Sequence, residues 1–268
     1  MSYTLRSDIQ YAALTAIVNS TSGCDANRQY MSELNGILPL LETIKTTSNH
    51  AIMLEAIKAL VNMAFTSKFV SGCILSDGGD IVLVEVIQGC DILRQPLLAH
   101  SALAALTNLC TYAPTQTHVG HTEGLVEVAV LVIKHTKQAF VVAQAASLLL
   151  AVMWKNMANK IRVGTKNACA ALVQRIVQQS NDLSDESLHC LERLCHAVAT
   201  FCFLTPNQEF MKTANGNYLL THAFTSFTHH TPILLRHQGN CLNSQENQQR
   251  PLTAIPQFCV MRLGAVAR

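Results

Sequence analysis

The chain has 268 residues, of which 49% are hydrophobic and only 13% are charged, and its formal net charge is +2. Enough apolar side chains are present to bury a large core, so the composition excludes intrinsic disorder over the whole chain. The Lys and Arg residues are scattered, which excludes the basic patch expected of a nucleic-acid-binding protein. Ordinary soluble domains have about 25% charged residues, so the low charge leaves room for faces covered by more protein.

The N-terminal segment, residues 1–10, is polar and carries Arg6 and Asp8, so we expect no secretory signal. Ten cysteines occur, mostly within apolar helical patterns and without the close spacing of a disulfide framework. We expect reduced thiols in a cytoplasmic or nuclear protein.

Five segments share one helical template, in which a small residue is followed four positions later by an apolar residue. Their period of about 45 residues is typical of solenoid repeats. An asparagine occupies a further shared position as Asn19, Asn62 and Asn108, and this register continues as Val152 and Arg193. The segments are residues 12–20, 55–63, 101–109, 145–153 and 186–194.

A glycine or asparagine recurs half a unit out of phase, immediately before an apolar run. Both residue types tolerate the left-handed backbone that ends a helix, so the pattern predicts a repeated corner between two helices. The similar phrases at residues 26–36 and 206–216 are two copies of this corner. The corner residues are Gly36, Gly79, Gly124, Asn167 and Gly216.

In the first complete unit the pattern predicts helices over residues 26–34, 37–46 and 50–65, with a polar loop before the third. No alternating stretch is long enough to build a sheet, so we expect an all-α solenoid. The uncharged run at residues 138–154 is at the short limit for a membrane span. It contains the repeat template, and we interpret it as a buried helix.

The pattern over residues 27–65, with NRQ, NG, ILPLLETI and EAIKALVNMAF, resembles the armadillo repeat. The resemblance covers about residues 5–235, and HEAT-type repeats are a similar all-helical alternative. It implies a right-handed α-solenoid of about five repeats, incomplete at both ends, whose third helices line a concave groove.

In the armadillo family, asparagines in this register hold an extended peptide by bonding its backbone amides. The resemblance therefore implies that Asn19, Asn62 and Asn108 face the groove and bind a partner, together with Lys58 and Arg193, the cations on or beside the register. The alternative is that the asparagines cap or bridge neighbouring third helices.

Nuclear-import adaptors of the family place a tryptophan one turn before each groove asparagine. This sequence has Thr15, Lys58, Ala104 and Leu148 there. We therefore do not expect it to bind basic localisation signals.

No catalytic constellation, nucleotide fingerprint or metal-ligand spacing is apparent, so we expect no enzyme, no cofactor and no metal site. The Cys and His cluster at residues 189–196 lies in a third-helix template, and we interpret it as core thiols with histidines at the rim. The SDGGD segment at residues 76–80 is interpreted as a corner.

We expect an armadillo-like repeat domain over residues 1–236 and a disordered or non-native tail over 237–268, where the amide-rich sequence contains Pro251 and Pro256. The chain is then a fragment or alternative isoform of a longer repeat protein. The predicted function is a non-catalytic scaffold that binds a peptide or helix of a protein partner on its concave face. The alternative is a structural segment of a larger repeat protein or assembly, with partners on its outer faces or ends. Other parts of a longer parent chain are one class of such partners. Neither nucleic acid nor membrane is expected as a partner.

Overall fold

The computed structural model describes residues 2–65, 67–165, 167–180, 182, 184–202, 204, 207 and 218. These residues form 13 α-helices and no strand, so the all-α prediction is confirmed. Apart from Asn207, the second corner phrase with Gly216 lies outside the described residues, and so does the predicted tail.

After α1 (Ser2–Thr21), the helices fall into units of a first, a second and a longer third helix. The first unit contains α2 (Asp25–Glu33), α3 (Ile37–Thr46) and α4 (His50–Ala64), within about one residue of the ranges predicted. The other units are α5 (Lys68–Ser76), α6 (Gly79–Gly89) and α7 (Pro96–Leu109); α8 (Ala113–His121), α9 (Leu125–His135) and α10 (Ala139–Met153); and α11 (Met157–Gly164), α12 (Ala168–Gln179) and α13 (Asp185–Phe201).

Local chemistry fixes where several helices begin. The Asn49 side chain accepts hydrogen bonds from the backbone of Ala51 and Ile52 at the start of α4. Ser67 and Ser184 cap α5 and α13 in the same way, and Pro96 occupies the first position of α7. Such caps satisfy backbone donors that a helix leaves unpaired.

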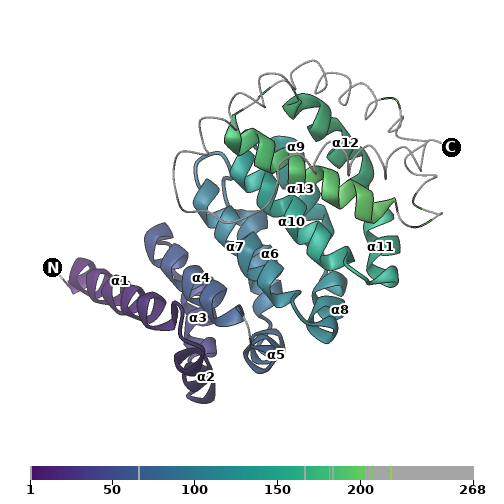
Figure 1. Cartoon of the computed structure of the whole chain (residues 1–268). Helices are drawn as coiled ribbons and strands as arrows, with labels where there is room; N and C mark the ends of the chain where they lie inside the picture. Colours follow the sequence, from purple (N-terminus) through teal and green to yellow (C-terminus); the bar gives the residue numbers. More distant parts are fainter. Residues whose placement is uncertain are drawn as a thin grey trace, which may run out of the picture.

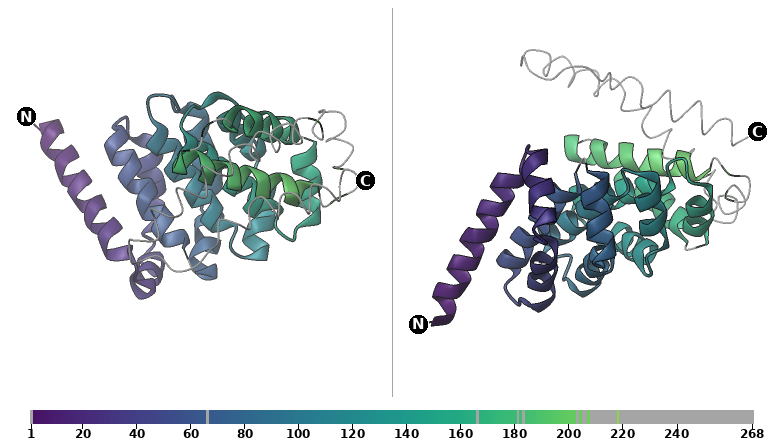
Figure 2. Two further views of the ribbon diagram at one scale, coloured as in Figure 1. Left: turned by 45° about the horizontal axis from the view of Figure 1, so that its top comes forward. Right: turned by 90° about the horizontal axis from the view of Figure 1, so that it is seen from below.

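The units stack into an α-solenoid (Figures 1 and 2). The third helices α1, α4, α7, α10 and α13 lie side by side in one layer, with α1 at one end of the row. The second helices α3, α6, α9 and α12 contact one another in order, as do the first helices α2, α5, α8 and α11. One hydrophobic core runs between the layers from Leu14 to Cys202.

The uncharged run at residues 138–154 forms α10, which is buried along most of its length. Among the described helices, none is both long enough and apolar enough to cross a membrane.

The corners form where the sequence predicts them, but two use a different residue for the left-handed turn. Asn35 and Gly78 have positive φ values of 55° and 76°, whereas the prediction assigned this role to Gly36 and Gly79. A Cβ at Gly36 would lie 2.9 Å from the Met31 carbonyl oxygen, so glycine is needed there for close packing. Gly79 is restricted in the same way by the preceding helix. At the later corners, Gly124 and Asn167 do adopt the left-handed conformation.

Candidate functional site

Two of the predicted asparagines connect neighbouring third helices. Asn62 on α4 donates from Nδ2 to the carbonyl oxygen of Val18 on α1 at 2.9 Å. Asn108 on α7 donates in the same way to the carbonyl oxygen of Val61 on α4 at 3.0 Å. Both carbonyls lie in the last turn of their helices, where acceptor capacity remains for outside donors. The asparagines thus bridge third helices, as the alternative interpretation of this register expects, and their role in partner binding stays a prediction.

Bridging uses only one end of each amide. Asn62 and Asn108 are half-buried, and neither Oδ1 atom has a donor among the described residues. A side-chain amide can donate and accept at the same time. Each Oδ1 therefore remains available to accept a hydrogen bond from a partner.

The other predicted site residues are spread along the row of third helices. Asn19 is exposed on α1, and Arg193 is half-buried on α13 at the opposite end. Lys58 Nζ lies 2.7 Å from Glu55 Oε1 on the same helix, with 45% of the lysine side chain exposed. The Glu55 side chain is buried, with 9% of its surface exposed, so the pair places a buried carboxylate beside a half-exposed cation. The structure brings Lys58 and Asn62 together on α4. The helices that carry Asn19 and Arg193, α1 and α13, lie far apart at opposite ends of the row (Figure 1).

The predicted continuation of the register at Val152 is wrong. Val152 is fully buried in the core, and the adjacent Ala151 takes the half-buried position on α10. The bridge between α7 and α10 comes instead from Gln144, whose Nε2 donates to Thr107 Oγ1 at 3.0 Å. The sequence template does not identify Gln144, because this residue lies two turns before the expected position. We define the third-helix face as a half-buried surface formed by α4, α7, α10 and α13. It includes Lys58, Asn62, Ala104, Asn108, Gln144, Ser147, Ala151 and Arg193.

A second set of polar side chains ties three of the first helices, α2, α5 and α11, to the end of the preceding third helix. Arg28 Nε donates to the Thr21 carbonyl at 2.8 Å, and Ser71 Oγ donates to the Ala64 carbonyl at 3.3 Å. Asn159 Nδ2 donates to the Val152 carbonyl at 3.0 Å. In all three pairs the donor lies seven residues after the acceptor. This recurrence of spacing does not follow from the helical template that the repeats share.

The Cys and His cluster contributes thiols to the core. Cys190 is buried, which raises its pKa to about 11, and Cys195 is half-buried. His189 lies on the exposed side of α13, with Nδ1 3.7 Å from Glu192 Oε2. In the described part of the chain no three potential metal ligands gather.

Asp80, in the SDGGD corner, joins the second unit to the third. Its carboxylate is buried, and Oδ2 accepts a hydrogen bond of 2.5 Å from Thr122 Oγ1. His118 Nε2 lies 3.3 Å from the same oxygen. The corner thus serves packing between units.

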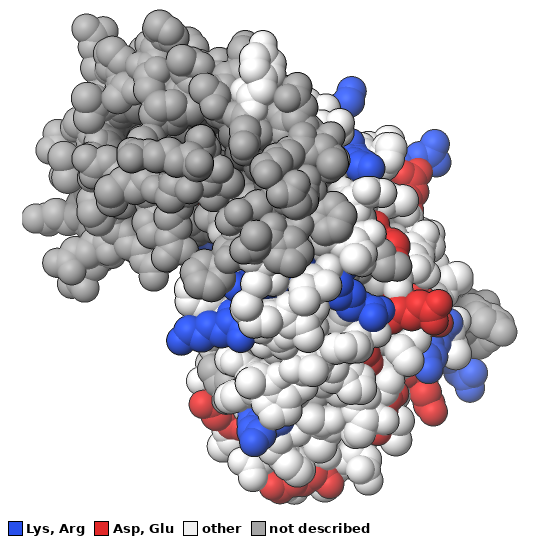
Figure 3. Space-filling view, turned by 90° about the vertical axis from the view of Figure 1, so that its right-hand side faces the viewer, with Lys and Arg blue, Asp and Glu red and all other residues white. Residues whose placement is uncertain are grey.

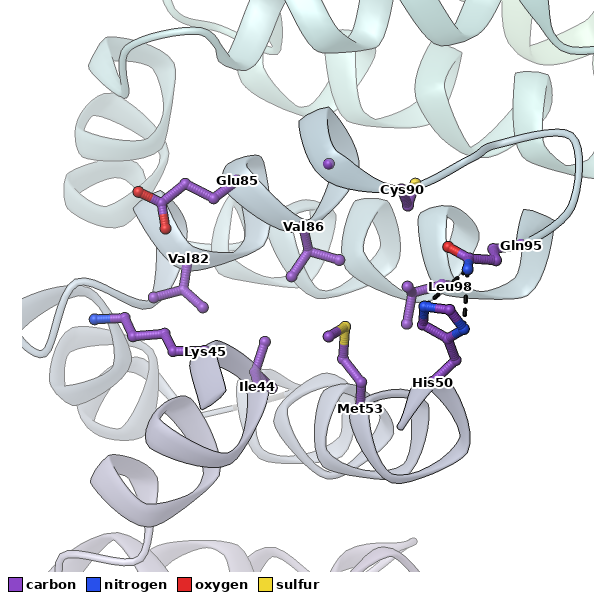
Figure 4. A pocket seen from close by; sticks show the side chains of 11 residues that line it. Ile44, Lys45, His50, Met53, Val82, Glu85, Val86, Cys90, Gln95 and Leu98 are labelled. Carbon is purple, nitrogen blue, oxygen red and sulfur yellow. Dashed lines mark hydrogen bonds between the residues drawn. The ribbon is translucent and has the colours of Figure 1, made fainter. Parts of the chain in front are cut away.

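A pocket of about 350 Å³ lies between the first and second units (Figure 4). Lys45 and Glu85 lie at one end, and His50 and Gln95 meet at the other, with 2.9 Å between the two Nε2 atoms. The pocket is large enough to take a side chain of a partner, but it shares no residue with the third-helix face. Its remaining lining residues are Ile44, Met53, Val82, Val86, Gly89, Cys90 and Leu98.

The surface carries few charges. On the side of the molecule shown in Figure 3, Lys, Arg, Asp and Glu lie mainly towards the edges of a broad uncharged area. This distribution favours contacts through apolar and neutral polar groups.

A family model described as the GAC ARM domain matches residues 95–232. No curated protein matches the chain. Among solved structures, an engineered protein has a TM-score of 0.72 at 18% identity, covering 97% of this chain and 92% of its own.

Two further solved structures are similar over most of this chain. A designed armadillo repeat protein in complex with the peptide (KR)4 has a TM-score of 0.70 at 15% identity, covering 96% of this chain and 92% of its own. A structure from work on the interaction between cadherin and β-catenin has a TM-score of 0.59 at 13% identity, covering 94% of this chain and 44% of its own. At these identities the similarity shows the armadillo solenoid fold alone.

Proposed function

This chain belongs to the GAC ARM domain family, and from that membership we propose that it is a non-catalytic scaffold that binds a segment of a protein partner on its third-helix face. The observation that supports the proposal most strongly is that the Oδ1 atoms of Asn62 and Asn108 accept no hydrogen bond from any described residue. They lie in the same register on adjacent parallel helices. We place this activity in the cytoplasm or the nucleus, as the cysteine content suggests.

The bridging bonds prepare these asparagines to bind. Because each Nδ2 is held by the preceding helix, the amide loses little further freedom when its Oδ1 accepts from a partner. The partner must therefore supply N–H donors, as an extended backbone does. Each such bond contributes only about 1 kcal/mol net, so side-chain contacts must add to the affinity.

The neighbouring side chains suggest the character of the partner. Ala104 and Ser147 are small and half-buried, and Lys58 and Arg193 are the cations on the third-helix face. The designed relative was solved with a basic peptide, (KR)4. With cations in its own face, this chain is better suited to a neutral or weakly acidic segment.

The experiment is affinity capture from cell extract with the full chain, followed by mass spectrometry. Ala104→Arg places a long charged side chain on the third-helix face without removing either asparagine bridge. Ala158→Arg is the matched control, because Ala158 is exposed on α11 in the first-helix layer. We expect partners that are retained by Ala158→Arg and lost from a folded Ala104→Arg variant. Identical partner lists for both variants would refute binding on this face.

The second candidate is a structural segment whose partners touch the outer faces or ends. The observation in its favour is that Asn62 and Asn108 already use their donors to join third helices. It predicts that Ala104→Arg leaves the partner list unchanged.

A further inference from the structure

Two aromatic side chains lie at one edge of the third-helix face. Phe65 and Trp154 directly follow α4 and α10, and they are 54% and 58% exposed. Their φ values of −79° and −61° are close to the helical value, so each side chain leaves the backbone as the next residue of the helix would. Residues three apart share a helical face, so Phe65 follows Asn62 and Trp154 follows Ala151 on that face. The two rings therefore extend the third-helix face beyond the ends of its helices.

Buried polar side chains hold both aromatic residues in place. Arg28 Nη1 donates to the Phe65 carbonyl oxygen at 3.3 Å, and the guanidinium carbon lies 5.5 Å from the centre of the Phe65 ring. Gln116 Nε2 donates to the Trp154 carbonyl oxygen at 2.7 Å. The two donors lie on the first helices α2 and α8 and are 5% and 7% exposed. A partner thus meets two rings whose backbone is already fixed, which lowers the entropy cost of binding.

The surroundings of the rings favour a neutral, extended partner. The Arg28 guanidinium already lies over Phe65, and Lys155, next to Trp154, is exposed, so a basic side chain would meet a cation beside each ring. The indole Nε1 of Trp154 donates to no described residue. An indole N–H can donate to a peptide carbonyl, whereas Asn108 Oδ1 can accept from a peptide N–H. Together they match both polar groups of an extended backbone.

The distance between the rings determines which side chains can reach both. The helix α7 lies between α4 and α10, so the rings are two helix spacings apart (Figure 1). Packed helices lie about 8–10 Å apart, which gives about 16–20 Å between the rings. An extended chain rises about 3.3 Å per residue, and side chains an even number of residues apart point to the same side. A separation of about six residues therefore fits.

We propose that Phe65 and Trp154 bind two apolar side chains, about six residues apart, of an extended partner segment that crosses α7. Each ring packs against one of these side chains, and the backbone between them donates to Asn108 Oδ1. The inference rests on the proposed binding at the third-helix face, and it names the residues that select the partner.

The chain contains one tryptophan, so the fluorescence of Trp154 reports directly on this site. The probe is a synthetic peptide of serines with two leucines six residues apart. The control peptide has the same composition with the leucines three residues apart, which places them on opposite sides of an extended chain. The first peptide, titrated into the full chain, should shift the Trp154 emission to shorter wavelength in a saturable way, because it covers the exposed indole. The control peptide should bind at least tenfold more weakly.

Phe65→Ala should also weaken binding of the first peptide at least tenfold, although Phe65 and the reporter follow different helices. Tyr30→Ala is the matched control, since Tyr30 is an exposed aromatic residue on α2 in the first-helix layer, and it should leave binding unchanged. The thermal midpoint of Phe65→Ala separates lost binding from lost folding. The comparison of the two peptides uses the original chain and tests the proposal even if this variant does not fold.

Absence of a saturable shift with the first peptide, or equal binding of the two peptides, overturns the proposal. Equal binding of the first peptide by the original chain and a folded Phe65→Ala variant does so too. Failure of the proposed function is read separately, from the partner lists of Ala104→Arg and Ala158→Arg. Partners that are lost from Ala104→Arg but retained by Phe65→Ala would support binding at the third-helix face and refute the role of the rings.

Discussion

Asn108 on α7 reaches across to the carbonyl oxygen of Val61 on α4, one residue before Asn62, which makes the equivalent bond to α1. Asn62 therefore lies beside the residue to which Asn108 donates. The asparagines that join the third helices can also contact a partner. Their effects on the stability of the chain and on partner binding must therefore be measured separately.

The first prediction concerns these bridges. Asn108→Ala removes the donor to the Val61 carbonyl, and the free energy of unfolding should fall by about 1 kcal/mol because the half-buried acceptor loses its partner. Asn19→Ala is the internal control, since Asn19 is exposed in the same register. We expect it to change stability by less than about 0.5 kcal/mol. Urea unfolding followed by circular dichroism measures both, and equal losses would show that the bridge contributes nothing specific.

The second prediction concerns the contact between α8 and α11. A Cβ at Gly120 would overlap the side-chain amide of Asn159, which is fully buried and donates to the Gln116 and Val152 carbonyls. Gly120→Ala should therefore destabilise the chain by more than about 2 kcal/mol. Asn159→Ala removes the overlap but also the two bonds, so the double variant should lose less than the two single losses added together. Strict additivity in thermal unfolding would contradict this geometry.

The third prediction concerns the buried carboxylate of Asp80. Thr122→Val removes its shortest hydrogen bond and should cost about 1–3 kcal/mol, whereas Thr122→Ser keeps the hydroxyl and should cost less. Replacing both groups, by Asp80→Leu with Thr122→Val, removes the buried charge together with its partner. The double variant should be more stable than Thr122→Val alone. A double variant that is less stable would mean that the carboxylate has another essential contact.

The fourth prediction concerns alkaline pH. Burial raises the pKa of the Cys110 thiol to about 12, compared with about 9 in an exposed thiol. Above pH 9 the unfolded chain therefore loses this proton while the folded chain keeps it, so stability falls as pH rises. Between pH 8 and pH 10 this thiol should contribute a loss of about 1 kcal/mol. The test compares urea unfolding of the original chain and Cys110→Ala at both pH values. An identical pH dependence of the two proteins would show that ionisation of the Cys110 thiol does not cause the loss of stability.

Helix positions in this chain follow from the sequence because each helix must bury one face. The apolar spacing in residues 50–65 and the polar loop before it located α4 almost to the residue. The corners were also predictable, since only a few residue types tolerate the left-handed backbone. The sequence did not predict that Asn35 and Gly78 adopt the left-handed conformation in place of the following glycines, Gly36 and Gly79. Those glycines are required for a different reason, the close packing against the preceding helix.

The candidate site was predictable only in part. The register of Asn62 and Asn108 is visible in the sequence, but the direction in which each amide donates depends on the neighbouring helix. The sequence template placed Val152, in place of Ala151, at the position of the asparagines. Both residues are small or apolar, so the template cannot tell which of these neighbours lies on the half-buried side of α10. Gln144 was missed because it bridges from a different turn of the helix.

The hydrogen bonds that join the units have a consequence for how the chain responds to force. Among the described residues, the side-chain bonds that reach furthest along the sequence link positions 47 residues apart, as between Asn108 and Val61. None of the side-chain hydrogen bonds among the described residues joins the first unit to the last. Folding therefore requires mainly contacts between residues that are close in sequence, and it should be fast. When such a chain is pulled from its two ends, its units should unfold one after another, and the chain should lengthen in steps of about one unit each.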